Sequence, residues 1–211
     1  MLKLLAHRGM WQSREEQNTL PALNRALQHG YGVETDIRDR NGELVICHDP
    51  ADHNAPLLSE FLASYQSQGC DQVLALNIKA DGLQQMLATE LDRFGIRNYF
   101  VFDMSIPDTL HYLSNGFEVF MRKSELEFHP VLTKKCQGLW MDEPSSAWFS
   151  KDELLEYTQY TGSLALVSAE LHGRDQHQQW QLISDAVGQL SERQQWYLCT
   201  DFPELAERTF G

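Results

Sequence analysis

Two carboxylates and an imidazole lie close together in residues 32–50 of this chain. Glu34 and Asp36 are two residues apart in an alternating apolar and polar run, which predicts a strand with both carboxylates on one face. Such a pair can share a divalent cation, because Mg²⁺ and Ca²⁺ prefer oxygen ligands. His48 follows a second short apolar run, residues 44–47, and imidazole is the side chain most often used to accept and donate protons.

The two runs are joined by Asn41 and Gly42, residue types that tolerate a positive φ angle and are typical of a tight hairpin turn. The hairpin predicts that the carboxylate pair and His48 meet in one small region. A cation site and a group able to move protons would then lie side by side.

The rest of the chain supplies the elements that must position these residues. We predict about eight strands, at residues 3–6, 33–37, 72–78, 99–102, 118–121, 138–141, 163–167 and 195–199. We predict helices at residues 57–65, 82–94, 107–113, 151–160, 177–190 and 203–208, after a first helix capped by Asn18 or Thr19 and ended by Gly30. No helix is predicted between residues 123 and 135. The alternation predicts an α/β protein with a short (β/α)₈ barrel, formed by residues 1–211 as a single domain.

A doubly wound open sheet is the competing fold. It normally has a glycine-rich phosphate loop after the first strand, and His7-Arg8-Gly9 is not such a loop. In a barrel, active-site residues follow the strands at their C-terminal ends. The polar residues at these positions are His7, Arg8, Glu34, Asp36, Asn77, Lys79, Asp103, Arg122, Asp142, Glu170, His172 and Asp201.

Composition limits the partners of the chain. With 211 residues and a formal charge of −13, it would repel nucleic acid and anionic membrane surfaces overall. No apolar stretch is long enough for a membrane span, and no signal peptide is visible, so we expect no stable membrane insertion and a cytoplasmic location. The four scattered cysteines are expected to be reduced core residues. The sequence does not predict an oligomeric state.

Several short motifs, in this order and spacing, resemble the glycerophosphodiester phosphodiesterase family, whose barrel is that of phospholipase C-like phosphodiesterases. They are His7-Arg8-Gly9, Asn18-Thr19, Glu34-x-Asp36, His48-Asp49, Asn77-Ile78-Lys79 and Thr200-Asp201-Phe202-Pro203. The resemblance covers essentially the whole chain.

The resemblance implies a metal-dependent phosphoric diester hydrolase that acts on a small anionic glycerophosphodiester. It implies His7 and His48 as the acid and base, and Glu34 and Asp36 as ligands of Mg²⁺ or Ca²⁺, with Asn77 at a third ligand position. In this family a hydroxyl of the substrate attacks first, and water then opens the cyclic phosphate. Arg8 and Lys79 would hold the phosphate, and we add Arg122 to these cations because it ends the predicted fifth strand.

The chain departs from the family pattern in three places. Asn77 and Gln17 each stand where the family has glutamate, and the insertion that commonly follows the His-Asp motif is absent. The first change removes one negative charge from the cation site. The absence of the insertion suggests a more open site and a larger diester, such as a glycerophosphate-bearing glycan or lipid head group.

Other interpretations stay open at this stage. Glu34 and Asp36 could form surface ion pairs with Arg38 or Arg40, the two histidines could be interior residues, and Asn77 could simply orient Lys79. The barrel could bind a phosphate ligand with weakened catalysis because of Asn77. It could also be a lyase that releases a cyclic phosphate.

Overall fold

The computed structural model describes residues 2–127 and 131–211. The chain forms two compact units, Met1–Leu5 with Val119–Gly211 and Ala6–Glu118. Strand β1 (Leu2–His7) contributes residues to both units. The expectation that residues 1–211 form a single domain stays a prediction.

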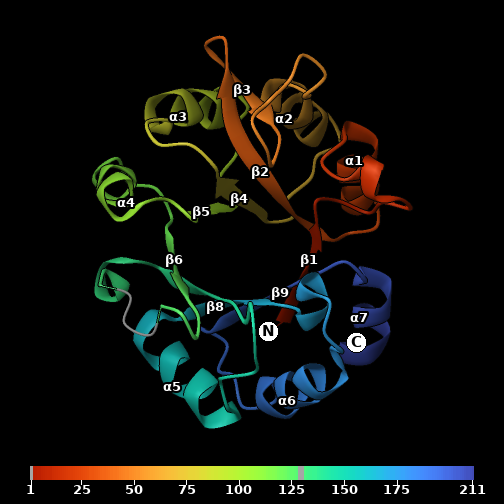
Figure 1. The fold of residues 1–211 in the computed structure, drawn as a ribbon, viewed down its shortest axis with the longest axis vertical. Helices are drawn as coiled ribbons and strands as arrows, with labels where there is room; N and C mark the ends of the chain where they lie inside the picture. Colours follow the sequence, from red (N-terminus) through yellow and green to blue (C-terminus); the bar gives the residue numbers. More distant parts are fainter. Residues whose placement is uncertain (1, 128–130) are drawn as a thin grey trace. The chain divides into compact units, whose positions relative to one another are not determined.

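The Ala6–Glu118 unit contains β2, β3, β4, β5 and the last two residues of β1, in the order β5-β4-β2-β1 with β3 paired to β2 (Figure 1). Their bounds are β2 Gly32–Arg40, β3 Glu43–Ile46, β4 Leu74–Ile78 and β5 Tyr99–Phe102. β2, β4 and β5 are parallel, and Asp36 is in register with Asn77. β3 is antiparallel to β2 across the predicted turn, where Asn41 and Gly42 have φ angles of 53° and 84°. The predicted hairpin is therefore confirmed.

Helices lie around these strands in Figure 1. They are the 3₁₀ helix η1 Arg14–Glu16 and the α-helices α1 Leu20–Gln28, α2 Leu58–Ser67, α3 Gln84–Arg93 and α4 Ile106–Ser114. Thr19 caps α1 by accepting a hydrogen bond from the Ala22 N–H, and Pro21 occupies the first turn, where a missing N–H costs nothing. The apolar residues of β2, β4 and β5 are buried beneath these helices, so the polar residues that end the strands stand out against an apolar core.

The other unit contains strands in the order β1-β9-β8-β7-β6. Their bounds are β6 Phe120–Lys123, β7 Gly138–Met141, β8 Ser163–Val167 and β9 Gln195–Thr200, and consecutive strands of this series are parallel. The strands are joined by 3₁₀ helices η2 Thr133–Lys135 and η3 Ala169–His172 and by α-helices α5 Lys151–Thr161, α6 His177–Val187 and α7 Pro203–Phe210. Ser150 and Glu153 form a reciprocal capping box that starts α5.

Eight parallel strands alternating with helices along the chain are the element order of a (β/α)₈ barrel, so the predicted fold class is confirmed. Strands 138–141 and 163–167 have the predicted bounds. β6 begins and ends two residues later than predicted. No α-helix occupies the described part of residues 123–135, as expected; residues 128–130, which include His129, lie outside the description.

Candidate active site

Glu34 and Asp36 lie on the same face of β2 and are almost completely buried, with 2% and 0% of their surfaces exposed. They do not pair with Arg38 or Arg40, as the surface alternative required, within the part of the chain that is described. Two carboxylates held out of water need positive partners or ligands, because an isolated buried charge is costly. Their surroundings therefore define the candidate site.

Asp36 is surrounded by donors. Its Oδ2 lies 3.0 Å from the Nε of Arg8 and accepts a 2.8 Å hydrogen bond from the Nδ2 of Asn18. Its Oδ1 lies 3.6 Å from the Nζ of Lys79. Lys79 is in turn bonded to Asp103, with 2.9 Å between Nζ and Oδ2. One buried carboxylate thus faces two of the three cations, Arg8 and Lys79, that are predicted from the sequence to bind the phosphate.

Glu34 has weaker partners than Asp36. Its Oε1 accepts a 3.2 Å hydrogen bond from the Nδ2 of Asn77, and its Oε2 lies 3.9 Å from the Nε2 of His7. Burial raises the pKa of Glu34, and the neighbouring Asp36 carboxylate raises this pKa further, against the smaller opposing effect of His7 and the nearby cations. The Glu34 carboxylate is therefore the group that would gain most from a cation.

The loop after β1 has an unusual backbone that presents His7 and Arg8. Arg8 has a φ angle of 57°, and its N–H donates to the carbonyl oxygen of Glu34 at 2.9 Å. Gly9 has a φ angle of 89°, and a Cβ there would come within 2.5 Å of the Ala22 backbone, so only glycine fits. The indole of Trp11 donates to the His7 carbonyl at 3.0 Å, which fixes the backbone of the candidate acid or base.

Backbone strain is concentrated around this site. Four non-glycine residues in the described part of the chain have positive φ angles, and three of them, Arg8, Asn18 and Asp103, belong to the network around Asp36. Asn18 is held further by the Arg8 carbonyl, which accepts from its N–H at 3.0 Å, and by a 2.7 Å bond from the Thr35 hydroxyl. Strained residues of this kind persist where the surrounding structure holds them in place, commonly at functional sites.

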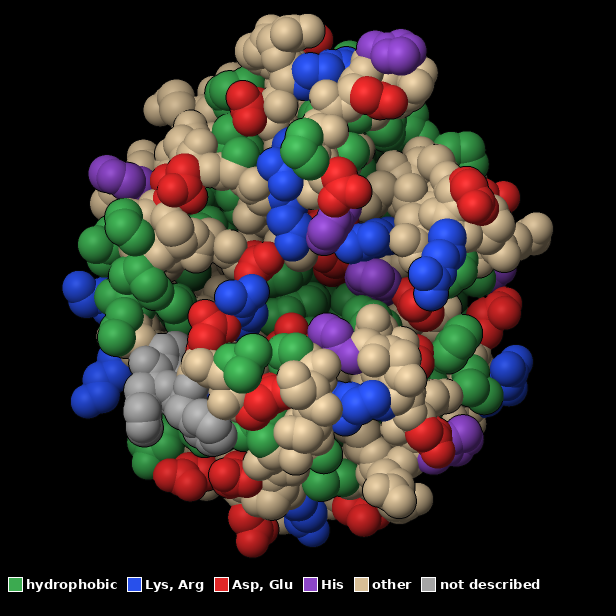
Figure 2. Space-filling view, in the orientation of Figure 1, with side chains coloured by type: hydrophobic (Ala, Val, Ile, Leu, Met, Phe, Trp, Pro, Cys, Tyr) green, Lys and Arg blue, Asp and Glu red, His purple; other side chains and the backbone are tan. Residues whose placement is uncertain are grey.

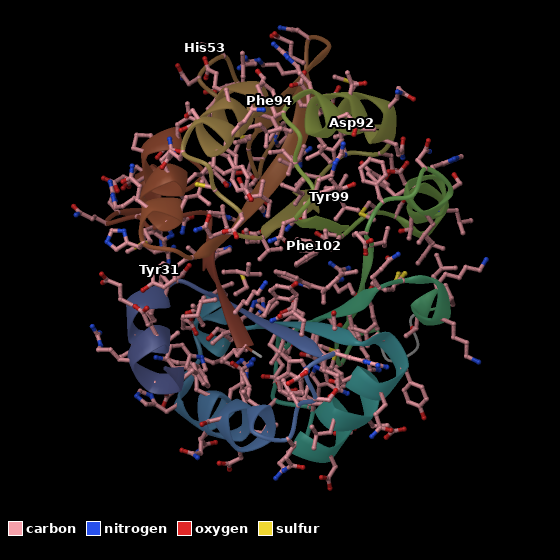
Figure 3. All side chains as sticks on the ribbon, turned by 180° about the vertical axis from the view of Figure 1, so that it is seen from behind. Tyr31, His53, Asp92, Phe94, Tyr99 and Phe102 are labelled. Carbon is pink, nitrogen blue, oxygen red and sulfur yellow. The ribbon has the colours of Figure 1, made fainter. Side chains whose placement is uncertain are left out.

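His48 is attached to the site through the backbone. The N–H of Cys47 donates to the Asp36 carbonyl at 3.0 Å, so the residue after it begins beside the carboxylate pair. The His48 ring is about half exposed, and its Nδ1 is 2.8 Å from Oδ1 of Asp49. His53, by contrast, lies in the outer loop between β3 and α2 (Figure 3).

Gln17 and Arg122 lie in different compact units. Gln17, which replaces a glutamate of the family pattern, accepts a 3.3 Å hydrogen bond from Arg8. Arg122 belongs to the other compact unit, where its guanidinium pairs with Glu127. Its predicted phosphate contact therefore stays a prediction. The other residues form two groups, His7 with Glu34 and Asn77, and Arg8 with Asp36 and Lys79, which the hydrogen bond from the Arg8 N–H to the Glu34 carbonyl joins.

Sequence reasoning placed Asp103 at a strand end but gave it no role. It follows β5 directly, and the register of β5 beside β4 brings it to Lys79, as the position of Phe102 at the end of β5 in Figure 3 illustrates. The signal in the sequence was an acidic residue directly after an apolar run at residues 99–102. Its partner depended on strand register, which the sequence does not display.

The donor atoms fit a hard divalent cation. Buried oxygens of Glu34, Asp36 and Asn77, namely Oε2, Oδ1 and Oδ1, accept no hydrogen bond from the described residues. Carboxylate and amide oxygens are the ligands that Mg²⁺ and Ca²⁺ take. Residues 2–127 and 131–211 contain no metal-ligating group of three or more His, Cys, Asp or Glu, so a cation here would use the amide oxygen of Asn77 as its third protein ligand.

The strand ends of the other unit carry a separate set of polar contacts. His172 Nε2 lies 2.6 Å from Oδ1 of Asp142, and Glu170 accepts from the Asp201 N–H at 3.1 Å and from the Thr200 hydroxyl. A pocket of about 300 Å³ in this unit is lined by Arg122, Ser124, Leu126, Glu127, Asp142 and Pro144. Among these residues, Arg122 pairs with Glu127, and Asp142 pairs with His172.

None of the helices in the described residues is both long and apolar enough to cross a membrane. All four cysteines are free thiols, as predicted; Cys136 and Cys199 are buried, whereas Cys47 and Cys70 are partly exposed.

Comparison with known proteins gives a clear structural result. No family model and no curated protein sequence matches the chain. A solved structure from Galdieria sulphuraria, assigned as a glycerophosphodiester phosphodiesterase, superposes with a TM-score of 0.78 at 15% identity, covering 100% of this chain and 98% of that one. This chain has the fold of the glycerophosphodiester phosphodiesterases.

Two further structures agree. A glycerophosphodiester phosphodiesterase from Agrobacterium tumefaciens matches with a TM-score of 0.69 at 17% identity, over 99% of this chain and 100% of that one. An Oleispira antarctica phosphodiesterase, solved with its product sn-glycerol 3-phosphate, matches with a TM-score of 0.66 at 16% identity, over 98% and 96% of the two chains. The resemblance drawn from the sequence motifs is thus confirmed at the level of the fold.

Proposed function

We propose that this chain is a phosphodiesterase that hydrolyses glycerophosphodiester-like bonds with the help of a divalent cation. The observation that carries the proposal is the buried carboxylate pair Glu34 and Asp36, whose spare oxygens face the same small region as His7, Arg8 and Lys79. The solved structures with this fold support it, because they are phosphodiesterases and one of them holds sn-glycerol 3-phosphate.

Arg8 and Lys79 would bind the phosphate of the substrate. In the structure both cations face Asp36, and Lys79 also pairs with Asp103. Guanidinium and ammonium groups supply charge-assisted hydrogen bonds to phosphoryl oxygens, Arg by a planar fork and Lys as a point charge. They give a local positive region to a chain that carries a net charge of −13.

Glu34, Asp36 and Asn77 would hold Mg²⁺ or Ca²⁺ through their oxygens. When bound, the cation would neutralise the negative charge that develops on the phosphoryl oxygens and lower the pKa of a coordinated hydroxyl group. The buried, partly uncompensated Glu34 carboxylate supports this assignment.

His7 and His48 would move the protons. The Nδ1 of His48 faces the Asp49 carboxylate, so a proton held there leaves the Nε2 lone pair for the substrate. His7 Nε2 lies beside Glu34 and would exchange a proton on the opposite side of the phosphate. One group must accept the proton of the attacking hydroxyl, and the other must protonate the leaving alkoxide.

A second candidate function is supported by Asn77. The amide supplies an uncharged oxygen where the family pattern has a carboxylate, so the site has less negative charge to attract a cation. In that case the chain would be a barrel that binds a phosphate ligand and has little catalytic turnover. A lyase that stops at the cyclic phosphate is the third candidate.

Phosphorus NMR of glycerophosphocholine incubated with the protein and Mg²⁺ or Ca²⁺ separates these candidates. We expect the diester signal to be replaced by that of sn-glycerol 3-phosphate. A stable cyclic phosphate signal would select the lyase. An unchanged diester spectrum, with sn-glycerol 3-phosphate binding detected by calorimetry on the same sample, would select the binding protein.

A further inference from the structure

The face of β2 that carries the candidate cation ligands continues beyond them. Glu34, Asp36 and Arg38 occupy alternate positions of the strand and therefore share one face. Two residues of strand place Arg38 about 7 Å further along than Asp36. Arg38 is only partly buried, whereas both carboxylates are enclosed. It thus stands between the buried site and solvent.

Arg38 is held beside His48. Its Nε donates a 2.9 Å hydrogen bond to the His48 carbonyl oxygen, and the residue opposite it on β3 is the uncharged Val45. The remaining guanidinium nitrogens have no carboxylate partner among the described residues. Asp49, which follows the hairpin, directs a carboxylate oxygen to the His48 ring. The hydrogen bond and charge of His48 lower the pKa of Asp49, and the charges of Arg38 and Arg8 lower this pKa slightly further.

Arg38 forms no ion pair with a carboxylate among the described residues, although the chain is acidic overall. Asp and Glu number 30 against 17 Lys and Arg. Other arginines of the Ala6–Glu118 unit pair with carboxylates: Arg8 with Asp36, Arg25 with Glu16, Arg93 with Glu90 and Arg97 with Asp92. Arg40, the next residue on the face, is occupied by the carbonyl oxygens of Asp52 and Ala55. Figure 2 shows Lys, Arg and His side chains gathered over the β2 region.

We propose that Arg38 is a specificity-determining residue that binds a second anionic group, a carboxylate or phosphate, on the alcohol of the diester. This inference rests on the proposed phosphodiesterase function and adds a substrate class to it. The diester phosphate is held at Arg8 and Lys79, and an anionic substituent of the alcohol extends along β2 to the free nitrogens of Arg38. Arg38 is positioned for this role by its own bond to the His48 backbone.

Two diesters that differ by a single carboxylate test the proposal. Glycerophosphoserine carries a carboxylate on its alcohol that glycerophosphoethanolamine lacks. We expect wild-type protein to have the higher kcat/KM for glycerophosphoserine. Arg38→Gln should lower this value about tenfold, through KM, and change the value for glycerophosphoethanolamine by less than about twofold, because one charge-assisted bond is lost. Arg38→Lys should recover part of the preference.

Arg93→Gln is the matched control, since it removes the same charge from the last residue of α3, where the guanidinium pairs with Glu90. It should leave the ratio of the two kcat/KM values unchanged. Equal losses on both diesters in Arg38→Gln would overturn the proposal, because Arg38 would then act only through His48. Unchanged kcat/KM values for both diesters in Arg38→Gln would also overturn it. Failure of the wild-type protein to hydrolyse either diester would instead overturn the proposed function, and the inference with it.

Discussion

Asp36 and Arg8 form a buried contact at the centre of the candidate site, with 3.0 Å between Oδ2 and Nε. Lys79 approaches the other oxygen of Asp36 to 3.6 Å. The carboxylate assigned to the cation therefore also neutralises Arg8 and Lys79, two of the groups assigned to the phosphate. A cation that takes Asp36 would release Arg8 and Lys79, so cation and phosphate binding should favour each other.

Asp36→Asn tests this relationship. Removing the carboxylate charge frees Arg8 and Lys79, so we expect the variant to bind sn-glycerol 3-phosphate more tightly than wild type in EDTA, by about fivefold. Added Mg²⁺ or Ca²⁺ should tighten binding to wild type but not to the variant. Calorimetry gives both affinities. Weaker binding by the variant in EDTA would show that Asp36 organises the two cations rather than competing for them.

Glu34→Gln should separate stability from cation binding. Burial makes the Glu34 carboxylate unfavourable in the folded chain, and a neutral amide of the same shape removes that cost. We expect the free energy of unfolding in EDTA to rise by about 1 kcal/mol. The rise in unfolding temperature caused by Mg²⁺ or Ca²⁺ should disappear. A variant that is less stable than wild type and still responds to the cation would remove Glu34 from the ligand set.

Gly9→Ala should be much more harmful than a change at another glycine with a similar backbone. Gly9 and Gly30 have φ angles of 89° and 84°, but only the Cβ at position 9 would meet backbone, 2.5 Å from Ala22. We expect Gly30→Ala to cost about 1 kcal/mol and Gly9→Ala about 3 kcal/mol, the difference reporting the clash. Urea denaturation measures both. Equal costs would mean that the loop after β1 adjusts without strain.

His172 should stabilise the fold in a pH-dependent way. Its 2.6 Å contact with Asp142 raises the pKa of His172 above the ordinary value of 6.5, first through the hydrogen bond and then through charge, against an opposing effect of burial. Because the folded pKa is the higher one, this stabilisation is fully present below pH 6.5 and is lost as pH rises through the raised value.

His172→Gln should therefore cost about 1 kcal/mol more at a pH of about 5.5 than at a pH of about 8.5. Urea denaturation at the two pH values measures the difference. His177→Gln is the control, because that imidazole pairs with Asp175 on the surface, with 79% of its side chain exposed. A cost for His172→Gln that does not vary with pH would contradict the assigned ion pair.

The comparison of sequence with structure shows where pattern reasoning succeeds. The hairpin at Asn41 and Gly42 was predictable because local turn chemistry decides it. For β6, the sequence predicts a strand at residues 118–121, whereas β6 extends to Lys123. Lys123 is in fact buried, with its ammonium 5.0 Å from the ring centre of Trp148 and 4.9 Å from that of Tyr157. That environment comes from α5 and the loop before it.

In the candidate site, too, local sequence motifs were predictable and tertiary contacts were not. Glu34, Asp36 and His7 could be named because their motifs are contiguous in the sequence. The link between Lys79 and Asp103 could not, since it depends on the register of β4 and β5. The partner of Asp36 could not be predicted either. Arg38 and Arg8 are both possible partners in the sequence, and the burial of Asp36 beside Arg8 decides between them.

Hydrolysis of glycerophosphocholine, measured in parallel with EDTA, Mg²⁺, Ca²⁺ and Mn²⁺, tests the central claim most directly. We expect turnover that requires a cation and that falls by about two to four orders of magnitude in His7→Ala and in His48→Ala. His53→Ala, in the outer loop, should match wild type. No turnover by the folded wild-type protein with any cation, or turnover that survives both substitutions, would contradict the assignment of this site as a metal-dependent phosphodiesterase.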